Sequence, residues 1–257
     1  MTSIEELHRL AAEGPITMLT AYDAPTARLI EESGIDIILV GDSLGNTVLG
    51  YESTLPVTLA EMESHTAAVV RATSTVPVIA DMPFLSYGIK RSESIRNCGR
   101  MLKEVGADAV KLESGPHTVA LTDQLTDRGI PVMAHVGTRP QHTHQDGGLT
   151  QKGESDAEAE TIVRLAKEHE EAGAFSVVVE HVPDSLARTV TDAVDVPTIG
   201  IGAGPDTDGQ VLVLADVLGL TEESPPFSEQ FGDVAGEMRS AMTEYREAVE
   251  DGQFPRD

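Results

Sequence analysis

Polar and ionisable side chains stand at the ends of short apolar segments that recur along this 257-residue chain. They are Asp42 with Ser43, Asp81, Lys111 with Glu113, His135, and Glu180. If the segments are parallel strands of a barrel, these side chains meet at the carboxyl ends of the strands, where barrel enzymes have their active sites. Carboxylates, an amine and an imidazole at one edge predict metal-assisted or acid–base chemistry.

Three of these acids, Asp42, Asp81 and Glu113, come from neighbouring predicted strands and would repel one another unless a positive charge lies among them. A hard divalent cation with oxygen ligands meets that need. The few protein ligands would leave coordination sites for water and for a chelating substrate, which is typical of Mg²⁺. The sequence therefore predicts one Mg²⁺ per subunit at these three acids.

Each of these side chains also has a purely structural interpretation. Asp42 could cap the turn that follows it, and Glu113 could pair with Lys111 on the same strand. Glu180 could cap the helix that comes next, and His135 could be a satisfied histidine of the barrel interior. The placement of all these groups at strand ends favours the functional interpretation.

Other reactive side chains are expected in exposed or structural positions. His142 and His144 flank Thr143 in a polar loop, Gln141–Gly153, and we expect both imidazoles to face solvent. Cys98 is the single cysteine, lies within a predicted helix, and is typical of a small core residue. One cysteine excludes a disulfide framework and a zinc site built from several thiolates.

The elements that must position these groups alternate between short β-branched runs and helical patterns. The predicted strands are Ile16–Tyr22, Asp36–Asp42, Pro77–Asp81, Ala109–Glu113, Pro131–Val136, Phe175–Glu180, Pro197–Gly202 and Ala215–Gly219. The predicted helices between them are Pro25–Ser33, Thr58–Thr73, Ser92–Val105, Thr118–Arg128, Ser155–Gly173, Asp184–Ala193 and Asp208–Leu214. Most strands are continuously apolar, as in a parallel sheet covered on both faces. The pattern predicts an α/β fold, a single (β/α)8 TIM barrel, with a doubly wound sheet as the alternative.

No linker interrupts this alternation, so we expect one domain over residues 1–257. A short amphipathic helix within Met1–Gly14 precedes the barrel, and a helix near Ser228–Val249 follows it in a C-terminal tail. Acidic and apolar residues are interleaved in that last helix. Its apolar positions need a partner surface, which predicts a homo-oligomer.

Charge is the strongest compositional signal. Asp plus Glu total 43 and Lys plus Arg total 18, which gives a net charge of −25 at pH 7. A field of that sign repels phosphate backbones, so we expect no binding to nucleic acid. The acids are dispersed and lysines are few, which favours a halophilic protein whose self-repulsion is screened by salt. An ordinary acidic enzyme is the alternative.

We expect a cytoplasmic protein that does not bind membranes. No apolar run approaches the ~18 residues that a membrane span needs. The N-terminal segment carries Glu5, Glu6 and Glu13 and has neither a basic n-region nor an apolar h-region.

Several motifs together point to one known family. The segment VGDSLGNTVLGYESTLPVT (Val40–Thr58), with HTAAV at His65–Val69, resembles ketopantoate hydroxymethyltransferases. Further motifs similar to this family follow in the same order: ADMPF (Ala80–Phe84), VKLE (Val110–Glu113), PQ (Pro140–Gln141), GG (Gly147–Gly148), IGIGAG (Ile199–Gly204) and TDGQVLV (Thr207–Val213). The resemblance extends from about Thr20 to Asp251. It implies a barrel of the phosphoenolpyruvate mutase/isocitrate lyase type.

The resemblance also implies roles for the residues at the strand ends. The family's metal ligands fall on Asp42, Asp81 and Glu113. Its substrate contacts fall on Asp42, Ser43, Asp81 and Lys111, with His135 lining the site. Its proton acceptor falls on Glu180. The family further implies a decamer of two pentameric rings.

The reaction of the family is magnesium-dependent transfer of a hydroxymethyl group from 5,10-methylenetetrahydrofolate to 3-methyl-2-oxobutanoate. The product is 2-dehydropantoate, a precursor in pantothenate and coenzyme A biosynthesis. A 2-oxo acid chelates Mg²⁺ through its carboxylate and keto oxygens, and the metal and Lys111 would stabilise the enolate. Glu180 would take the proton that C3 loses.

Three alternatives stay open. The loop Gln141–Gly153 keeps the glycines of the family but is more polar than expected, so another reduced pterin could carry the carbon. A lyase that cleaves a 2-methylisocitrate-like acid would carry a catalytic cysteine in a loop, whereas Cys98 lies mid-helix. A non-enzymatic cation binder would be expected to lose Lys111, His135 and Glu180, which are all present.

Overall fold

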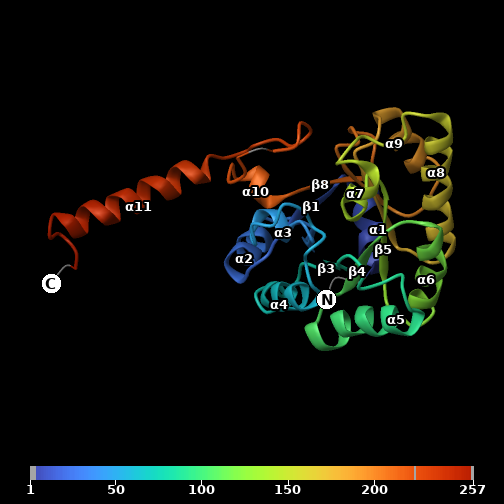
Figure 1. Ribbon diagram of the computed structural model, residues 1–257, viewed down its shortest axis with the longest axis horizontal. Coiled ribbons are helices and arrows are strands. Elements are labelled where there is room, and N and C mark those ends of the chain that lie inside the picture. The colour runs from blue at the N-terminus through green and yellow to red at the C-terminus, as the bar shows by residue number, and fades with distance from the viewer. Residues whose placement is uncertain (1–3, 223, 256–257) are drawn as a thin grey trace. The chain divides into compact units, whose positions relative to one another are not determined.

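The strands form a closed barrel in the order β1 to β8, as predicted (Figure 1). This computed structural model describes residues 4–222 and 224–255. The strands are β1 (Ile16–Thr20), β2 (Ile37–Val40), β3 (Val78–Asp81), β4 (Ala109–Glu113), β5 (Val132–Gly137), β6 (Ser176–Glu180), β7 (Thr198–Ile201) and β8 (Gly209–Leu212). Successive strands from β1 to β8 pair in parallel. The carboxyl ends of the strands therefore share one rim.

Helices fill the segments between the strands. They are α1 (Ile4–Glu13), α2 (Ala24–Glu32), α3 (Leu44–Thr47), α4 (Leu59–Val70), α5 (Arg91–Arg100), α6 (Pro116–Thr126), α7 (Thr143–Asp146), α8 (Asp156–Glu171) and α9 (Asp184–Thr191). A π-helical turn, η1 (Met101–Val105), continues α5, and a 3-10 turn, η2 (Pro140–His142), precedes α7. Thr58 and Glu61 form a capping box at α4, and Ser155 caps α8, so local hydrogen bonds set these starts.

The last strand was predicted in the wrong place. The sequence pattern predicted a helix over Asp208–Leu214 and a strand over Ala215–Gly219, whereas the structure has β8 and then a short helix, α10 (Leu214–Val217). β8 alternates between buried and more exposed side chains, unlike the continuously buried β2, β3 and β4. A Cβ on Gly209 would lie 2.5 Å from the carbonyl oxygen of Ile16, so glycine permits the approach of β8 to β1.

Inward-facing side chains on and beside the strands, together with Leu7 of α1, form one buried cluster inside the barrel. It contains Leu7, Ile16, Met18, Ile37, Leu39, Ile79, Ala109, Met133, Phe175, Val178, Ile199 and Val211. Side chains alternate between the two faces of a strand, so the residue two positions further along points the same way. Those next inward positions are Asp81, Lys111, His135 and Glu180. The polar groups therefore stand directly above the apolar core of the barrel.

The opposite faces of β5 and β6 pack against the outer helices. Ala134, Val136, Val177 and Val179 from these strands share a second buried cluster with α8 and α9. Leu165 of α8 and Leu186 of α9 belong to the same cluster, and both are nearly fully buried. Burial of such side chains contributes ~1.5–3 kcal/mol each, which holds β5 and β6 and their ends in place.

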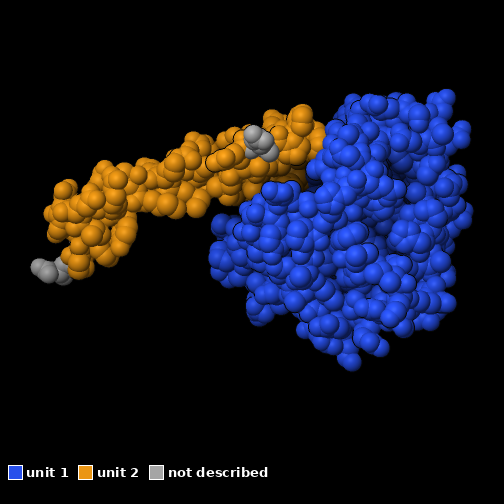
Figure 2. Space-filling model, in the orientation of Figure 1, with its two compact units in different colours: residues 1–211 blue, residues 212–257 orange. Residues whose placement is uncertain are grey.

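The chain divides into two compact units, residues 1–211 and residues 212–257 (Figure 2). The second unit contains α10 and α11 (Val234–Glu250). α11 begins later than the predicted Ser228, because Asp233 caps it by accepting a hydrogen bond from the backbone of Gly236. No described side chain of α11 is buried. Its exposed apolar side chains are Met238, Met242, Tyr245 and Val249. Their spacing of three and four residues places them on one face.

None of the helices in residues 4–222 and 224–255 combines the length and the apolar character needed to span a lipid bilayer.

Candidate active site

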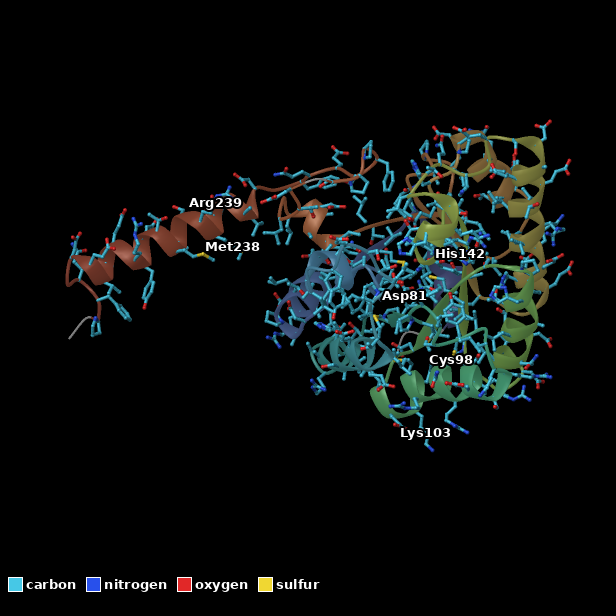
Figure 3. All side chains as sticks on the ribbon, viewed as in Figure 1. Asp81, Cys98, Lys103, His142, Met238 and Arg239 are labelled. Carbon is cyan, nitrogen blue, oxygen red and sulfur yellow. The ribbon has the colours of Figure 1, made fainter. Side chains whose placement is uncertain are left out.

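Asp81 and Lys111 form an ion pair at the mouth of the barrel. They lie opposite each other in the pairing of β3 and β4, and Lys111 Nζ donates a 2.6 Å hydrogen bond to Asp81 Oδ1. Burial alone would lower the pKa of Lys111, but the charges of Asp81 and Asp42 outweigh it and raise that pKa, so the amine stays cationic. Figure 3 shows Asp81 among the strands, whereas Lys103 points outward from η1.

Asp42 follows β2 and is joined to this pair. Its backbone N–H donates to Asp81 Oδ2 at 3.1 Å, and its own Oδ2 accepts a 2.9 Å hydrogen bond from Gln141 Nε2. Burial, and then the charge of Asp81, raise the pKa of Asp42 to about 7. Ser43 occupies the N-cap of α3 and makes no side-chain capping bond there. The carboxylate of Asp42 therefore bonds to Gln141 within the site.

Glu113 is buried at the end of β4 and keeps one oxygen without a partner. Its Oε1 accepts a 2.9 Å hydrogen bond from the backbone of Gln141, whereas its Oε2 is buried and has no hydrogen-bond partner. Burial, and then the charge of Asp42, raise the pKa of Glu113 well above its usual value. The alternative pairing of Glu113 with Lys111 is wrong, because the amine bonds to Asp81.

His135 and Glu180 form a second pair on the same rim. His135 Nε2 lies 3.1 Å from Glu180 Oε2, with side-chain exposures of 1% and 17%. Burial, and then the charge of Lys111, lower the pKa of His135, so its imidazole is neutral near pH 7. α9 begins after Pro183 without a side-chain capping bond, so Glu180 does not cap it.

The backbone next to Glu180 requires a glycine. Gly137 lies opposite Glu180 in the pairing of β5 and β6 and has a φ of +96°. A Cβ at Gly137 would lie 2.2 Å from the carbonyl oxygen of Glu180. Glycine therefore allows the close approach that sets the position of Glu180 on the rim.

Ser43 is held through an aromatic side chain. Its Oγ lies 2.8 Å from the hydroxyl of Tyr22, and the backbone oxygen of Tyr22 lies 2.6 Å from His65 Nδ1. Burial raises the pKa of Tyr22, so the phenol stays protonated and can donate to Ser43. The predicted substrate-binding residues Asp42 and Ser43 are thus both anchored at the mouth.

Two residues of this site were missed from the sequence. The sequence places Gln141 in the PQ motif and at the start of a polar loop without a role in the site, and it gives no signal for Tyr87, yet both are buried among the strand-end carboxylates. Gln141 belongs to η2 and not to an irregular loop. In the same segment His144 is exposed, as predicted, whereas His142 is half-buried. Cys98 is fully buried in α5, as predicted, and burial raises the pKa of its thiol to about 12.

The carboxylates at the mouth keep protein partners. Within the part of the chain that the structure describes, no three His, Cys, Asp or Glu side chains are arranged to hold a metal ion. Asp81 bonds to Lys111, and Asp42 and Glu113 bond to Gln141. The metal-binding role of these acids stays a prediction.

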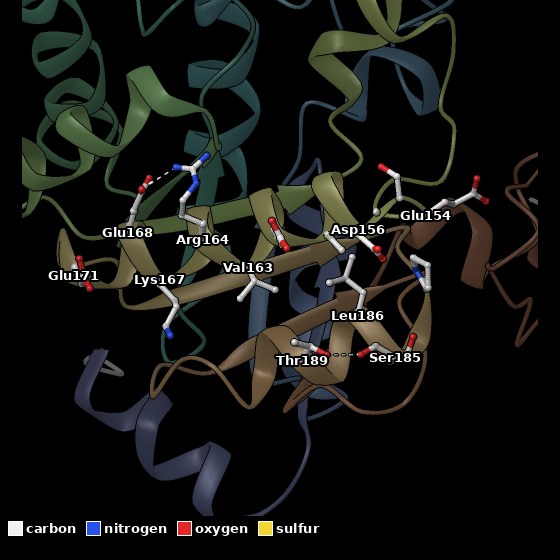
Figure 4. Close-up of a pocket in the computed structure, with 15 residues that line it drawn as sticks. Glu154, Asp156, Val163, Arg164, Lys167, Glu168, Glu171, Ser185, Leu186 and Thr189 are labelled. Carbon is white, nitrogen blue, oxygen red and sulfur yellow. Dashed lines mark hydrogen bonds and ion pairs between the residues drawn. The ribbon is translucent and has the colours of Figure 1, made fainter.

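Two hollows differ in their relation to this site. A cleft of about 720 Å³ lies between the loop after α3 and the segment around α7, both of which follow strand ends. It is lined by Gly50, Tyr51, Glu52, Ser53, Pro56, Thr143, His144, Gly147 and Gly148. A hollow of about 1130 Å³ lies between α8 and α9 (Figure 4). Its lining includes Val163, Leu186 and the Arg164–Glu168 ion pair but no strand-end residue, so it is separate from the site.

The fold and the strand-end site define a class of protein. The phosphoenolpyruvate phosphomutase of Streptomyces platensis subsp. rosaceus has a TM-score of 0.66 and 15% identity, covering 97% of this chain and 88% of that one. A 2,3-dimethylmalate lyase, described as a PEP mutase/isocitrate lyase superfamily member, has a TM-score of 0.62 and 17% identity, covering 99% and 90%. The chain has the barrel fold of that superfamily, as predicted.

Sequence comparison gives the family. The ketopantoate hydroxymethyltransferase model matches residues 1–257. A 3-methyl-2-oxobutanoate hydroxymethyltransferase of Haloarcula marismortui is 61% identical, covering 100% of this chain and 95% of its own length. One of Halobacterium salinarum is 62% identical, covering 94% of this chain and 88% of its own length. The chain belongs to the ketopantoate hydroxymethyltransferase family and is an enzyme. Both relatives come from halophilic archaea.

Proposed function

We propose that this enzyme transfers a hydroxymethyl group from 5,10-methylenetetrahydrofolate to 3-methyl-2-oxobutanoate and so makes 2-dehydropantoate for pantothenate and coenzyme A biosynthesis. The observation that carries the proposal is the pairing of Glu180 with a buried, neutral His135 beside the Lys111–Asp81 ion pair. One pair offers a carboxylate base, and the other offers a fixed positive charge for the developing enolate.

The proposal includes one Mg²⁺ per subunit, held by Asp42, Asp81 and Glu113. Three buried carboxyl groups lie around one ammonium, and Glu113 Oε2 lacks a hydrogen-bond partner, so the oxygen donor set suits a hard cation. Mg²⁺ commonly uses one or two carboxylates plus water and substrate, so it does not need a preformed cluster of three. When bound, the ion would supply Lewis-acid polarisation of a 2-oxo acid.

Lys111 and Glu180 divide the remaining work. The Lys111 ammonium binds the anionic substrate and offsets the negative charge that develops on the keto oxygen. Glu180 accepts the C3 proton, and the buried His135, whose Nε2 lies 3.1 Å from Glu180 Oε2, limits the space in which that carboxylate can move. Water adds to the methylene carbon of the carrier, both of its bonds to the carrier nitrogens break, and tetrahydrofolate leaves with the two protons of that water. The carbon, now at the level of formaldehyde, forms the new bond to C3, and its oxygen takes up the proton that Glu180 had accepted, which gives the hydroxymethyl group.

The carrier would approach through the cleft that contains Tyr51 and His144. Its volume of about 720 Å³ is within the usual range for a ligand pocket, and both of its walls follow strand ends. The polar segment that includes His144 makes a different reduced pterin the alternative carrier. Turnover measured with each carrier separates the two.

A C3 proton-exchange experiment tests the chemistry without a carrier. With protein, Mg²⁺ and D₂O, the C3 proton of 3-methyl-2-oxobutanoate should be replaced by deuterium, and NMR follows the loss of its signal. A lyase acting on a 2-methylisocitrate-like acid would instead cleave that acid and leave 3-methyl-2-oxobutanoate unchanged. No exchange together with such cleavage would overturn the proposal.

We also propose that the protein is a homo-oligomer, a decamer of two pentameric rings. The exposed apolar face of α11, which includes Met238, Met242 and Tyr245, supports association with another copy. Light scattering in molar salt measures the mass directly. A particle of 27.3 kDa would be a monomer and would contradict the proposal.

A further inference from the structure

Gln141 has a buried position that joins three parts of the site. Its Nε2 donates to Asp42 Oδ2 and to the backbone oxygen of Met82, both at 2.9 Å. Its backbone N–H donates to Glu113 Oε1 at 2.9 Å. Its Oε1 accepts a 2.9 Å hydrogen bond from the hydroxyl of Tyr87. One residue that is 7% exposed therefore contacts two of the three carboxylates, Asp42 through its side chain and Glu113 through its backbone.

The direction of these hydrogen bonds is set by the backbone of Glu113. Its N–H donates to the hydroxyl oxygen of Tyr87 at 3.2 Å, so the Tyr87 proton is free to point at Gln141 Oε1. The amide nitrogen of Gln141 must then face Asp42 and Met82, and its two N–H groups meet two acceptors. A flipped amide would place its oxygen against two acceptors, Asp42 Oδ2 and the Met82 carbonyl oxygen, and would lose both of those hydrogen bonds. The arrangement is therefore a directional chain from Glu113 through Tyr87 and Gln141 to Asp42.

The segment that carries Gln141 is anchored independently of this chain. The backbone of Thr138 donates to Glu180 at 2.8 Å, and its hydroxyl donates to Thr150 at 2.7 Å. At the far end, the backbone of Lys152 donates to His181 at 3.1 Å. Both ends of the segment are thus attached beside Glu180, so replacing the Gln141 side chain alone leaves the segment held in place.

We propose that Gln141, oriented by Tyr87, is a positioning residue that presents the Asp42 and Glu113 carboxylates to the Mg²⁺ ion and the 2-oxo acid. This inference rests on the proposed function. The hydrogen bond from Gln141 uses Asp42 Oδ2, and the backbone bond uses Glu113 Oε1, which leaves Glu113 Oε2 free for a ligand. Groups that orient metal ligands in this way typically change metal affinity or activity by about 10–100-fold when they are removed.

The test replaces the amide by a side chain of similar length without hydrogen-bonding groups. Gln141→Met should weaken Mg²⁺ binding, measured by calorimetry on the metal-free full chain, by about 10–100-fold. The KM for 3-methyl-2-oxobutanoate should rise with it, while kcat at saturating Mg²⁺ and substrate stays within about threefold because Glu180 is untouched. If Gln141→Met only destabilised the fold, a smaller fraction of the protein would be active. The measured kcat would then fall, while the Mg²⁺ affinity and the KM of the folded protein would stay as in the wild type.

Two further variants keep the test decisive. Tyr87→Phe keeps the ring but removes the orienting hydroxyl, so it should weaken Mg²⁺ binding in the same direction as Gln141→Met. The double variant should be no weaker than Gln141→Met alone, because both changes break one chain. Gln145→Met makes the same change at an exposed position of the same segment, where the side-chain oxygen lies 3.3 Å from His142 Nδ1, and it should match the wild type.

The outcomes separate the two levels of the proposal. If the wild type binds no Mg²⁺ and exchanges no C3 proton, the proposed function is overturned and this inference falls with it. If the wild type binds Mg²⁺ and exchanges the C3 proton, but Gln141→Met has the same Mg²⁺ affinity and KM, only the positioning role of Gln141 is overturned and the proposed function stands. Additive effects of Gln141→Met and Tyr87→Phe would overturn the orienting role of Tyr87.

Discussion

His135 Nε2 lies 3.1 Å from Glu180 Oε2 at the mouth of the barrel, with the imidazole buried and the carboxylate reaching the edge of the site. The two residues come from neighbouring strands, and the register of β5 with β6 sets their relative positions along the barrel axis. Because burial keeps His135 neutral, the two side chains do not form an internal ion pair. Glu180 thus stands beside a neutral imidazole and is available as a base.

Glu180→Gln should abolish proton exchange and preserve binding. Glutamine keeps the shape of the side chain but cannot accept the C3 proton, and loss of a general base typically slows the reaction by ~10²–10⁴-fold. Deuterium incorporation at C3 and calorimetric binding of 3-methyl-2-oxobutanoate measure the two properties separately. Exchange within about threefold of the wild type, or loss of binding together with exchange, would move the base to another residue, with His135 next.

Asp42→Asn and Asp81→Asn should both weaken Mg²⁺ binding but differ in stability. Asp81→Asn leaves the buried ammonium of Lys111 without its partner, and breaking such a pair costs about 3–5 kcal/mol. Asp42→Asn removes a charge that burial already disfavours, so it should destabilise the fold less. Excess Mg²⁺ should partly restore turnover in at least one variant.

Urea unfolding and calorimetry with Mg²⁺ measure these two effects. Equal losses of stability in the two variants would contradict the special role of the Lys111–Asp81 pair. If both variants bind Mg²⁺ as the wild type does, the assignment of these aspartates as metal ligands is wrong.

His169 should make the fold less stable as the pH falls from about 6.5 to about 4. It is fully buried in α8, where its Nδ1 lies 3.0 Å from the Thr122 hydroxyl of α6, and burial lowers its pKa to about 4. Between that value and the unfolded value of 6.5, the unfolded chain binds a proton that the folded chain does not. Unfolding is therefore favoured as the pH falls, by up to about 3 kcal/mol.

The variant His169→Gln tests this pH dependence because it keeps a hydrogen-bonding side chain and does not titrate. Its free energy of unfolding, measured by urea at several pH values, should fall less steeply between pH 6.5 and 4 than that of the wild type. His144→Gln changes an exposed imidazole and serves as the control, with a wild-type slope expected. Parallel curves for His169→Gln and the wild type would show that burial of His169 does not set the slope.

Stability should depend on high salt. A net charge of −25 per chain produces strong self-repulsion at low ionic strength, and salt screens it. The thermal midpoint should rise as KCl increases from tens of millimolar to molar. A midpoint that is unchanged or lower in molar KCl would mean that the acidic composition has another cause.

Much of the architecture follows from local pattern. Apolar runs predicted seven of the eight strands with small boundary errors, and the polar residue at each strand end marked the position of the site. The alternation of side chains along a strand makes this possible, because Ile79 and Asp81, or Ala109 and Lys111, must face the same side. β8 was misplaced because its side chains are not continuously buried, so its sequence lacks the signal used for the others.

What the sequence by itself determined was the family, the barrel and the residue types at the strand ends. Only the tertiary structure decided which of those residues are partners: Lys111 bonds to Asp81 and not to Glu113, and Glu180 lies beside His135. It also brought Gln141 to Asp42, 99 positions away. The physical reason is that a strand pattern fixes the face on which a side chain lies, whereas barrel closure and loop packing decide which distant groups come within hydrogen-bond distance.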